Sequence, residues 1–145
     1  MATHPLKDVR FLALSTACLL FIVLGHRFQS NIQAPLKKEL FRISDKIIVD
    51  WWSVSHMIYF AILGWWFPNR FWFFFGFGIV WELIEDFLSK DADTKLVNCY
   101  NKEYKGHFVK TWCNGIQDDY WYGKADDILM NTLGFIVGSY LRKWM

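Results

Sequence analysis

Four long apolar segments constrain the fold of this 145-residue chain more than any other feature. Each segment is long enough to cross a bilayer, or nearly so. A soluble domain of this length cannot bury four such segments in one core. The sequence therefore predicts an all-α fold, an integral membrane four-helix bundle that forms one transmembrane domain over residues 1–145. The predicted spans are residues 11–28, 51–67, 71–88 and 126–144.

The aromatic residues support a multi-pass membrane location. The chain is 54% hydrophobic and contains nine Trp and fourteen Phe, far above the usage of soluble domains. Indole rings prefer the headgroup region, and several Trp residues fall near the ends of the predicted spans. They are Trp51, Trp52, Trp65, Trp66, Trp72 and Trp144. The net charge of +2, with no basic stripe, argues against a nucleic-acid partner.

The segments before and after the first span have their own patterns. Two basic residues precede the first span, as in a secretory signal, but its apolar run is long and no small-residue cleavage site follows, so we expect a retained helix. Residues 34–49 place apolar side chains at approximately helical spacing, with Lys and Arg between them. This pattern predicts an interfacial amphipathic helix against anionic headgroups, with a solvated linker as the alternative.

A long polar loop, residues 89–124, precedes the last span. Its many Tyr and Trp residues favour a packed cap over a disordered segment. Cys99 and Cys113 lie in this loop, and they can pair only if the loop faces an oxidising compartment.

Three carboxylates lie in the last two turns of the third predicted span. Glu82, Glu85 and Asp86 follow one another at i, i+3 and i+4, so they project from one face of a helix. Like charges so placed repel, and each resists leaving water. They therefore require a cation, a proton or basic partners, unless the helix end simply emerges into water.

Topology brings further polar residues to the same membrane face. If each segment crosses once, the start of the second span, the end of the third and the start of the fourth lie together. These places hold Asp50, Ser53, His56, Glu82, Glu85, Asp86, Asp126, Asp127 and Asn131. Ionisable groups at such a depth mark a functional site, so we expect His56 within about 4 to 8 Å of the Glu82 carboxylate. Carboxylates with one imidazole and one amide suit Ca²⁺, Mg²⁺ or Mn²⁺.

Small residues predict a close helix crossing next to this site. Gly134 and Gly138 continue the helical face of the polar pair Asp127 and Asn131. Such a face lets a neighbouring helix approach closely, and the glycines at positions 76 and 78 of the third span are the expected partners.

Residues 50–139 resemble a known enzyme family through three ordered motifs. They are Asp50-x-x-Ser-x-Ser-His56, Trp81-Glu82-Leu83-x-Glu85 and Asp126-x-x-x-x-Asn131-x-x-Gly134-x-x-x-Gly138. Together they resemble the core of the eukaryotic base-exchange phosphatidylserine synthases. They are also similar to the small bacterial VanZ-like membrane proteins.

The resemblance to the synthases implies a phosphatidyltransferase that exchanges a phospholipid headgroup for serine with the help of calcium. It implies that His56 lies near the scissile phosphate and that Glu82, Glu85 and Asp126 hold the ion. From their place at the same membrane face, we also expect Asp86 among the metal ligands, and Asp127 and Asn131 beside His56 among the catalytic residues. The implied partners are the bilayer, of the endoplasmic-reticulum type in a eukaryote, and a phospholipid substrate. The VanZ-like alternative implies a non-catalytic or structural polytopic protein, working as a homo-oligomer or as a subunit of a larger membrane assembly.

Overall fold

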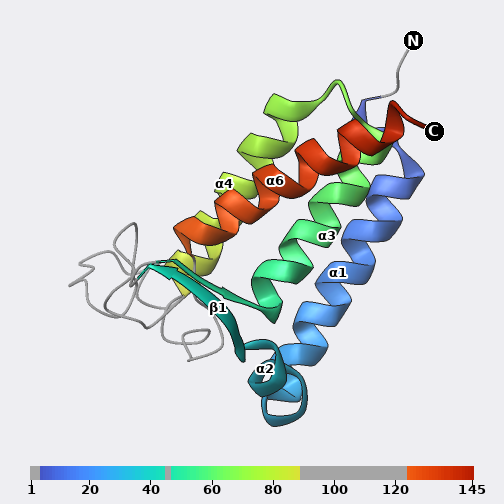
Figure 1. Ribbon diagram of the computed structural model, residues 1–145. Helices are drawn as coiled ribbons and strands as arrows, with labels where there is room; N and C mark the ends of the chain where they lie inside the picture. Colours follow the sequence, from blue (N-terminus) through green and yellow to red (C-terminus); the bar gives the residue numbers. More distant parts are fainter. Residues whose placement is uncertain (1–3, 45–46, 89–123) are drawn as a thin grey trace, which may run out of the picture.

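The computed structural model of the chain describes residues 4–44, 47–88 and 124–145. This part is mostly helical, with four long helices and one two-stranded hairpin (Figure 1). The long helices are α1 (Val9–Arg27), α3 (Trp51–Trp66), α4 (Phe71–Leu88) and α6 (Ala125–Arg142). The shorter elements are η1 (Pro5–Lys7), α2 (Gln29–Leu36), β1 (Glu39–Ser44) and β2 (Ile47–Asp50). Each long helix begins and ends within two residues of a segment predicted as a span.

The start of α3 is fixed by an N-cap. Asp50 Oδ1 accepts hydrogen bonds from the backbone N of Ser53, at 2.9 Å, and from its Oγ, at 3.1 Å. An N-cap carboxylate satisfies backbone donors that the first helical turn leaves free. At the other end of the helix, Arg142 Nη1 donates to the Trp65 carbonyl at 2.6 Å. The last turn of α6 therefore binds the last turn of α3.

Helices α3 and α6 pack backbone to backbone. A Cβ atom at Gly134 would collide with the carbonyl oxygen of Met57, and one at Gly138 would collide with that of Ala61. Gly64 of α3 makes the reciprocal contact with the backbone of α6. Only glycine permits so close an approach at these positions.

The predicted glycine partners on the third span are wrong. Gly134 and Gly138 face α3 and not α4. Gly76 of α4 has no atom within 4 Å of a Cβ built on it, and the nearest neighbours of Gly78 are side-chain atoms of Asn131 and Phe60. Spacing along one helix shows which residues share a face, but it does not show which helix that face meets.

The predicted interfacial helix over residues 34–49 is also wrong. Helix α2 ends at Leu36, and β1 and β2 then pair antiparallel, with Glu39 opposite Asp50 and Phe41 opposite Val49. β-branched residues crowd the second half of this segment, and such residues favour strands. They are Ile43, Ile47, Ile48 and Val49. The described residues are mostly helical, which is consistent with the predicted all-α class, and one small antiparallel hairpin interrupts the helices.

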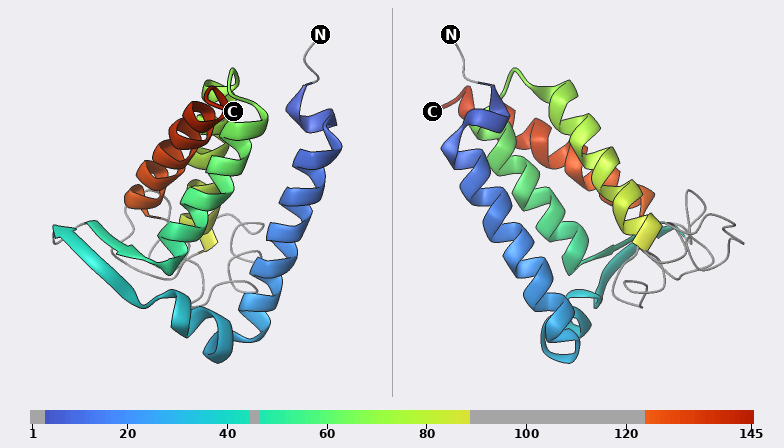
Figure 2. Two further views of the ribbon diagram at one scale, coloured as in Figure 1. Left: turned by 45° about the vertical axis from the view of Figure 1, so that its right-hand side comes forward. Right: turned by 180° about the vertical axis from the view of Figure 1, so that it is seen from behind.

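An aromatic core joins all four long helices. Its buried members are Phe11, Phe60, Leu63, Phe67, Phe74 and Phe135. Phe11 is one of only two buried residues of α1, so this helix adds little else to the core. Figure 2 shows α1 on the outer side of α3, with α3 between α1 and α6.

One helix in the described part of the chain is both long and apolar enough to cross a membrane. It is α1, with a mean hydropathy of 1.9 and only 11% of the stretch buried. A signal sequence near an N-terminus has the same length and composition. Helix α3 has only 16 residues, and α4 and α6 each carry three ionisable residues close to their ends.

Candidate metal centre

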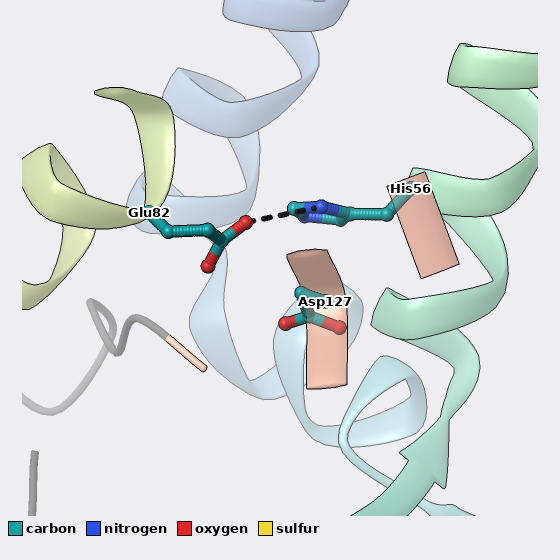
Figure 3. A group of neighbouring side chains, drawn as sticks. All are labelled: His56, Glu82 and Asp127. Carbon is teal, nitrogen blue, oxygen red and sulfur yellow. Dashed lines mark ion pairs between the residues drawn. The ribbon is translucent and has the colours of Figure 1, made fainter. Parts of the chain in front are cut away.

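The hairpin lies at the end of the bundle where α3 and α6 begin and α4 ends (Figure 1). These three helices bring polar side chains together there. His56 lies in the second turn of α3, Glu82 in the last two turns of α4 and Asp127 in the first turn of α6. One ligand atom of each lies within 4.8 Å of the other two. Figure 3 shows His56 and Glu82 pointing toward one another, with Asp127 beside them. Among the described residues this is the only group of three or more His, Cys, Asp or Glu so placed.

The His56 ring is oriented by two neighbours. Its Nδ1 lies 3.2 Å from Asn131 Oδ1 and 3.4 Å from Glu82 Oε1. Both neighbours are acceptors, and the carboxylate charge further favours a proton on the nearest nitrogen, so Nδ1 is the protonated nitrogen. The lone pair then lies on Nε2, which is the nitrogen able to accept a proton. The predicted proximity of His56 and Glu82 is confirmed, at a distance slightly below the expected range.

Two carboxylates of this group are buried, and one oxygen of each has no hydrogen-bond donor. Glu82 is 1% exposed and Asp127 is 2% exposed. Neither Glu82 Oε1 nor Asp127 Oδ1 accepts a hydrogen bond from any residue in the described part of the chain. An unsatisfied buried acceptor costs about 1–3 kcal/mol, and more when it is charged. A divalent cation between the two carboxylates would offset this cost, and carboxylate oxygens are ligands that suit Ca²⁺, Mg²⁺ or Mn²⁺.

Lys124, directly before α6, offsets part of the negative charge of the nearby carboxylates of Asp50, Asp126 and Asp127. Its Nζ donates to Asp50 Oδ2 at 2.9 Å, and its backbone N donates to Glu82 Oε2 at 3.1 Å. Burial lowers the pKa of the Lys124 ammonium, but the hydrogen bond and charge of Asp50, with smaller contributions from Asp127 and Asp126, raise it above its usual value.

Reasoning from sequence missed Lys124. The detectable signal was a lysine two residues before a pair of aspartates at a helix start, where the helix dipole disfavours a cation. A lysine in that place indicates a nearby carboxylate partner.

The other predicted site residues lie around this group and not within it. Glu85 is half-buried, Asp86 is 1% exposed and Asp126 is 7% exposed. None of these three joins the cluster of His56, Glu82 and Asp127 within 4.8 Å among the described residues. Of the four predicted metal ligands, the structure thus brings only Glu82 into the group, together with the predicted catalytic residues His56 and Asp127. The polar loop, with Cys99 and Cys113, lies outside the described residues except for Lys124.

No family model, curated protein or solved structure matches this chain. The function therefore has to be argued from the site and from the surface of the bundle.

Proposed function

We propose that this chain is a multi-pass membrane enzyme that exchanges the headgroup of a phospholipid with the help of a divalent cation. The observation that carries the proposal is the buried group of His56, Glu82 and Asp127. It places two carboxylates and one imidazole at a single end of a helical bundle whose outer surface is apolar.

Exposed apolar side chains on all four long helices support the membrane location. Leu20 of α1 is 59% exposed, Ile58 of α3 57%, Trp72 of α4 78% and Ile136 of α6 52%. In water, apolar surfaces of this extent lead to association. In a bilayer the same side chains meet acyl chains, and the ionisable groups of α4 and α6 lie near the helix ends, at the depth of the headgroups.

Exchange of one headgroup for another needs a base and a way to stabilise charge on the phosphate. As the hydroxyl oxygen of the incoming alcohol attacks phosphorus, His56 Nε2 takes its proton and then returns it to the leaving alkoxide. One phosphoester bond forms and one breaks. A divalent cation bound by Glu82 and Asp127 would offset charge on the non-bridging oxygens. The resemblance to base-exchange phosphatidylserine synthases supports serine as the incoming alcohol.

The first test is calcium binding by the purified protein in detergent. Millimolar Ca²⁺ should raise the melting temperature, because a ligand that binds only the folded state stabilises it. Glu82→Gln combined with Asp127→Asn should abolish the response, whereas Glu85→Gln, which changes a carboxylate outside the 4.8 Å group, should retain it. A parent without any response to Ca²⁺, Mg²⁺ or Mn²⁺ would overturn the metal centre.

The second test is the reaction itself. Labelled serine is supplied with calcium and liposomes of phosphatidylcholine or phosphatidylethanolamine, and labelled phosphatidylserine is expected. His56→Ala should remove the product while leaving the calcium response in place. A calcium-responsive parent that forms no labelled phosphatidylserine would exclude base exchange and leave a metal-binding membrane protein.

A second candidate function is a non-catalytic membrane scaffold of the VanZ-like kind, working within a larger assembly. It is favoured by Lys124, whose ammonium forms an ion pair with Asp50 and whose backbone N donates to Glu82, so that each of these carboxylates has a partner without any ion. For a scaffold, amidation of Glu82 should lower the melting temperature, and calcium should leave the parent unchanged. The absence of a calcium response in the parent is the opposite of the outcome expected for the enzyme.

A further inference from the structure

The hairpin of β1 and β2 is bound to the end of the bundle that carries the candidate metal centre. Asp50, the last residue of β2, caps α3 and pairs with Lys124 before α6. Asp126 of α6 accepts a hydrogen bond from the backbone N of Ile48, and Val49 is buried. A two-stranded hairpin alone is only marginally stable in water, so these contacts with the bundle hold it in place.

The hairpin runs crosswise to the long helices (Figure 1 and Figure 2). Where the long helices cross a membrane, strands with this direction lie along its surface and not through it. The hairpin also follows closely on α1, because α1 ends at Arg27 and β1 begins at Glu39, with only α2 between them. It therefore lies close to the headgroup layer even where α1 is the one helix that crosses.

Strand β1 keeps apolar side chains exposed. They are Leu40, Phe41 and Ile43, of which Ile43 is 63% exposed. Leu40 and Phe41 are neighbours on a strand, so they project from opposite faces, and both faces of β1 keep apolar surface. Exposed apolar side chains with polar ones around them mark contacts with a membrane or with another protein.

The charges beside β1 favour a membrane over a protein partner. Residues 27–44 contain four basic residues and one acidic residue. Arg42 Nη2 lies 3.0 Å from Glu39 Oε2, so these two charges offset one another. Lys37 and Lys38, directly before β1, are exposed and add positive charge beside the apolar side chains. Lysines next to exposed apolar residues suit a bilayer surface with anionic headgroups, which attract each lysine.

We propose that the hairpin binds a membrane surface that contains anionic phospholipid, with Phe41 and Ile43 inserted between the lipids and Lys37 and Lys38 bound to the headgroups. Amphipathic elements of this kind bury their apolar side about 5–10 Å into the boundary between headgroups and acyl chains. The inference goes beyond headgroup exchange, because it requires a membrane at the hairpin and no reaction at the metal centre. A protein that inserts the hairpin but forms no labelled phosphatidylserine would keep this inference and lose the exchange.

The first experiment measures the insertion of β1. In a parent whose three native cysteines are replaced by serine, Ile43→Cys carries an environment-sensitive fluorophore, and the full chain is placed in nanodiscs. The discs contain phosphatidylcholine alone or an equal mixture with phosphatidylglycerol, together with a lipid that carries a nitroxide on its acyl chain. We expect blue-shifted emission and strong quenching by the nitroxide in the anionic discs, and weaker quenching in the neutral discs.

Three results would overturn the inference. They are equal quenching in both kinds of disc, no quenching in either, and a blue shift without quenching, which would mean that a second copy of the chain covers β1. Phe41→Cys lies two residues earlier on the same strand. It provides a second labelling site if Ile43→Cys does not fold.

A pair of charge variants tests the role of the lysines. Each lysine near an anionic surface favours binding by about 5-fold, so Lys37→Gln with Lys38→Gln should lower the ratio of inserted to exposed hairpin by about 30-fold. Arg70→Gln with Lys143→Gln is the matched control, because it removes two exposed charges after α3 and α6, at the other end of the bundle. The control should keep the quenching of the parent in anionic discs. If the hairpin variant also keeps it, or if both variants lose it alike, the lysines of the hairpin do not bind lipid and the inference fails.

Discussion

At the scale of single residues, the centre is organised by amide and carboxylate groups that fix one histidine. The contacts of His56 Nδ1 with Asn131 and Glu82 leave Nε2 as the free base. A carboxylate or amide that orients a histidine in this way sets its tautomer and its ring orientation. Asn131 is thus a positioning residue for His56.

The N-cap of α3 yields the first prediction at this scale. Asp50→Ala should lower the free energy of unfolding by about 1–2 kcal/mol, because the first turn of α3 loses its cap. Asp50→Asn should cost less, since its amide oxygen still accepts from the Ser53 backbone N while the ion pair with Lys124 is lost. Chemical denaturation in detergent, monitored by circular dichroism, measures the unfolding free energy of both variants. Equal losses for the two variants would show that the cap contributes nothing.

The ion pair of Lys124 yields a pH dependence. The Lys124 pKa is raised above 10.5, mainly through Asp50 against the opposing effect of burial. A raised pKa of a base in the folded state means that its stabilisation is complete below pH 10.5 and is lost as the pH rises through the folded-state pKa. The difference in unfolding free energy between the parent and Lys124→Met should therefore be constant below pH 10.5 and shrink above it. A difference that stays constant at higher pH would contradict the pairing.

At the scale of elements, the contact between α3 and α6 positions the centre. It holds His56 of α3 against Asn131 of α6. Gly134→Ala should destabilise the protein by about 1–3 kcal/mol, the usual cost of overpacking, because even a methyl group collides with the Met57 carbonyl.

Gly76→Ala is the matched control for this helix contact. It introduces the same methyl group where nothing lies within 4 Å, and it should stabilise α4 slightly through helix propensity. Thermal unfolding of the two variants in detergent separates the effects. If both behave alike, the close crossing of α3 and α6 is not present in the folded protein.

Sequence periodicity predicted the four long helices well because each is bounded by clear signals. Asp50 caps α3, and Pro68 begins the turn before α4. The hairpin was missed because its apolar residues also satisfy a helical spacing, and only the pairing of β1 with β2 decides between the two.

The meeting of His56 and Glu82 followed from topology, since helix starts and ends alternate between the two ends of a bundle. The topology did not show which carboxylates would join His56 and Glu82. That choice depends on side-chain direction within one turn, and it favours Asp127 over its neighbour Asp126.

At the scale of the whole molecule, the bundle has two distinct ends. The turn between α3 and α4 lies at the same end as the start of α1 and the end of α6, and the hairpin lies at the other end (Figure 1). The candidate metal centre lies at the end with the hairpin, because α3 and α6 begin there and α4 ends there. Helix α3 has 16 residues, about 24 Å, which is shorter than the roughly 30 Å hydrocarbon core. In a multi-pass arrangement, such short helices would keep the polar centre near the headgroups of one leaflet, where a phosphodiester is located.

The multi-pass arrangement makes a topological prediction. Single cysteines at the exposed positions Asn69, in the turn after α3, and Lys38, directly before β1, should lie on opposite sides of the membrane. In sealed vesicles of a parent whose three native cysteines are replaced by serine, a membrane-impermeant maleimide should label one site from outside and the other only after permeabilisation. If α1 alone crosses the bilayer, everything after α1 lies on one side, and both positions should react alike. The same labelling therefore separates a single-span protein, whose polar centre would face water, from a bundle that holds this centre at the membrane surface.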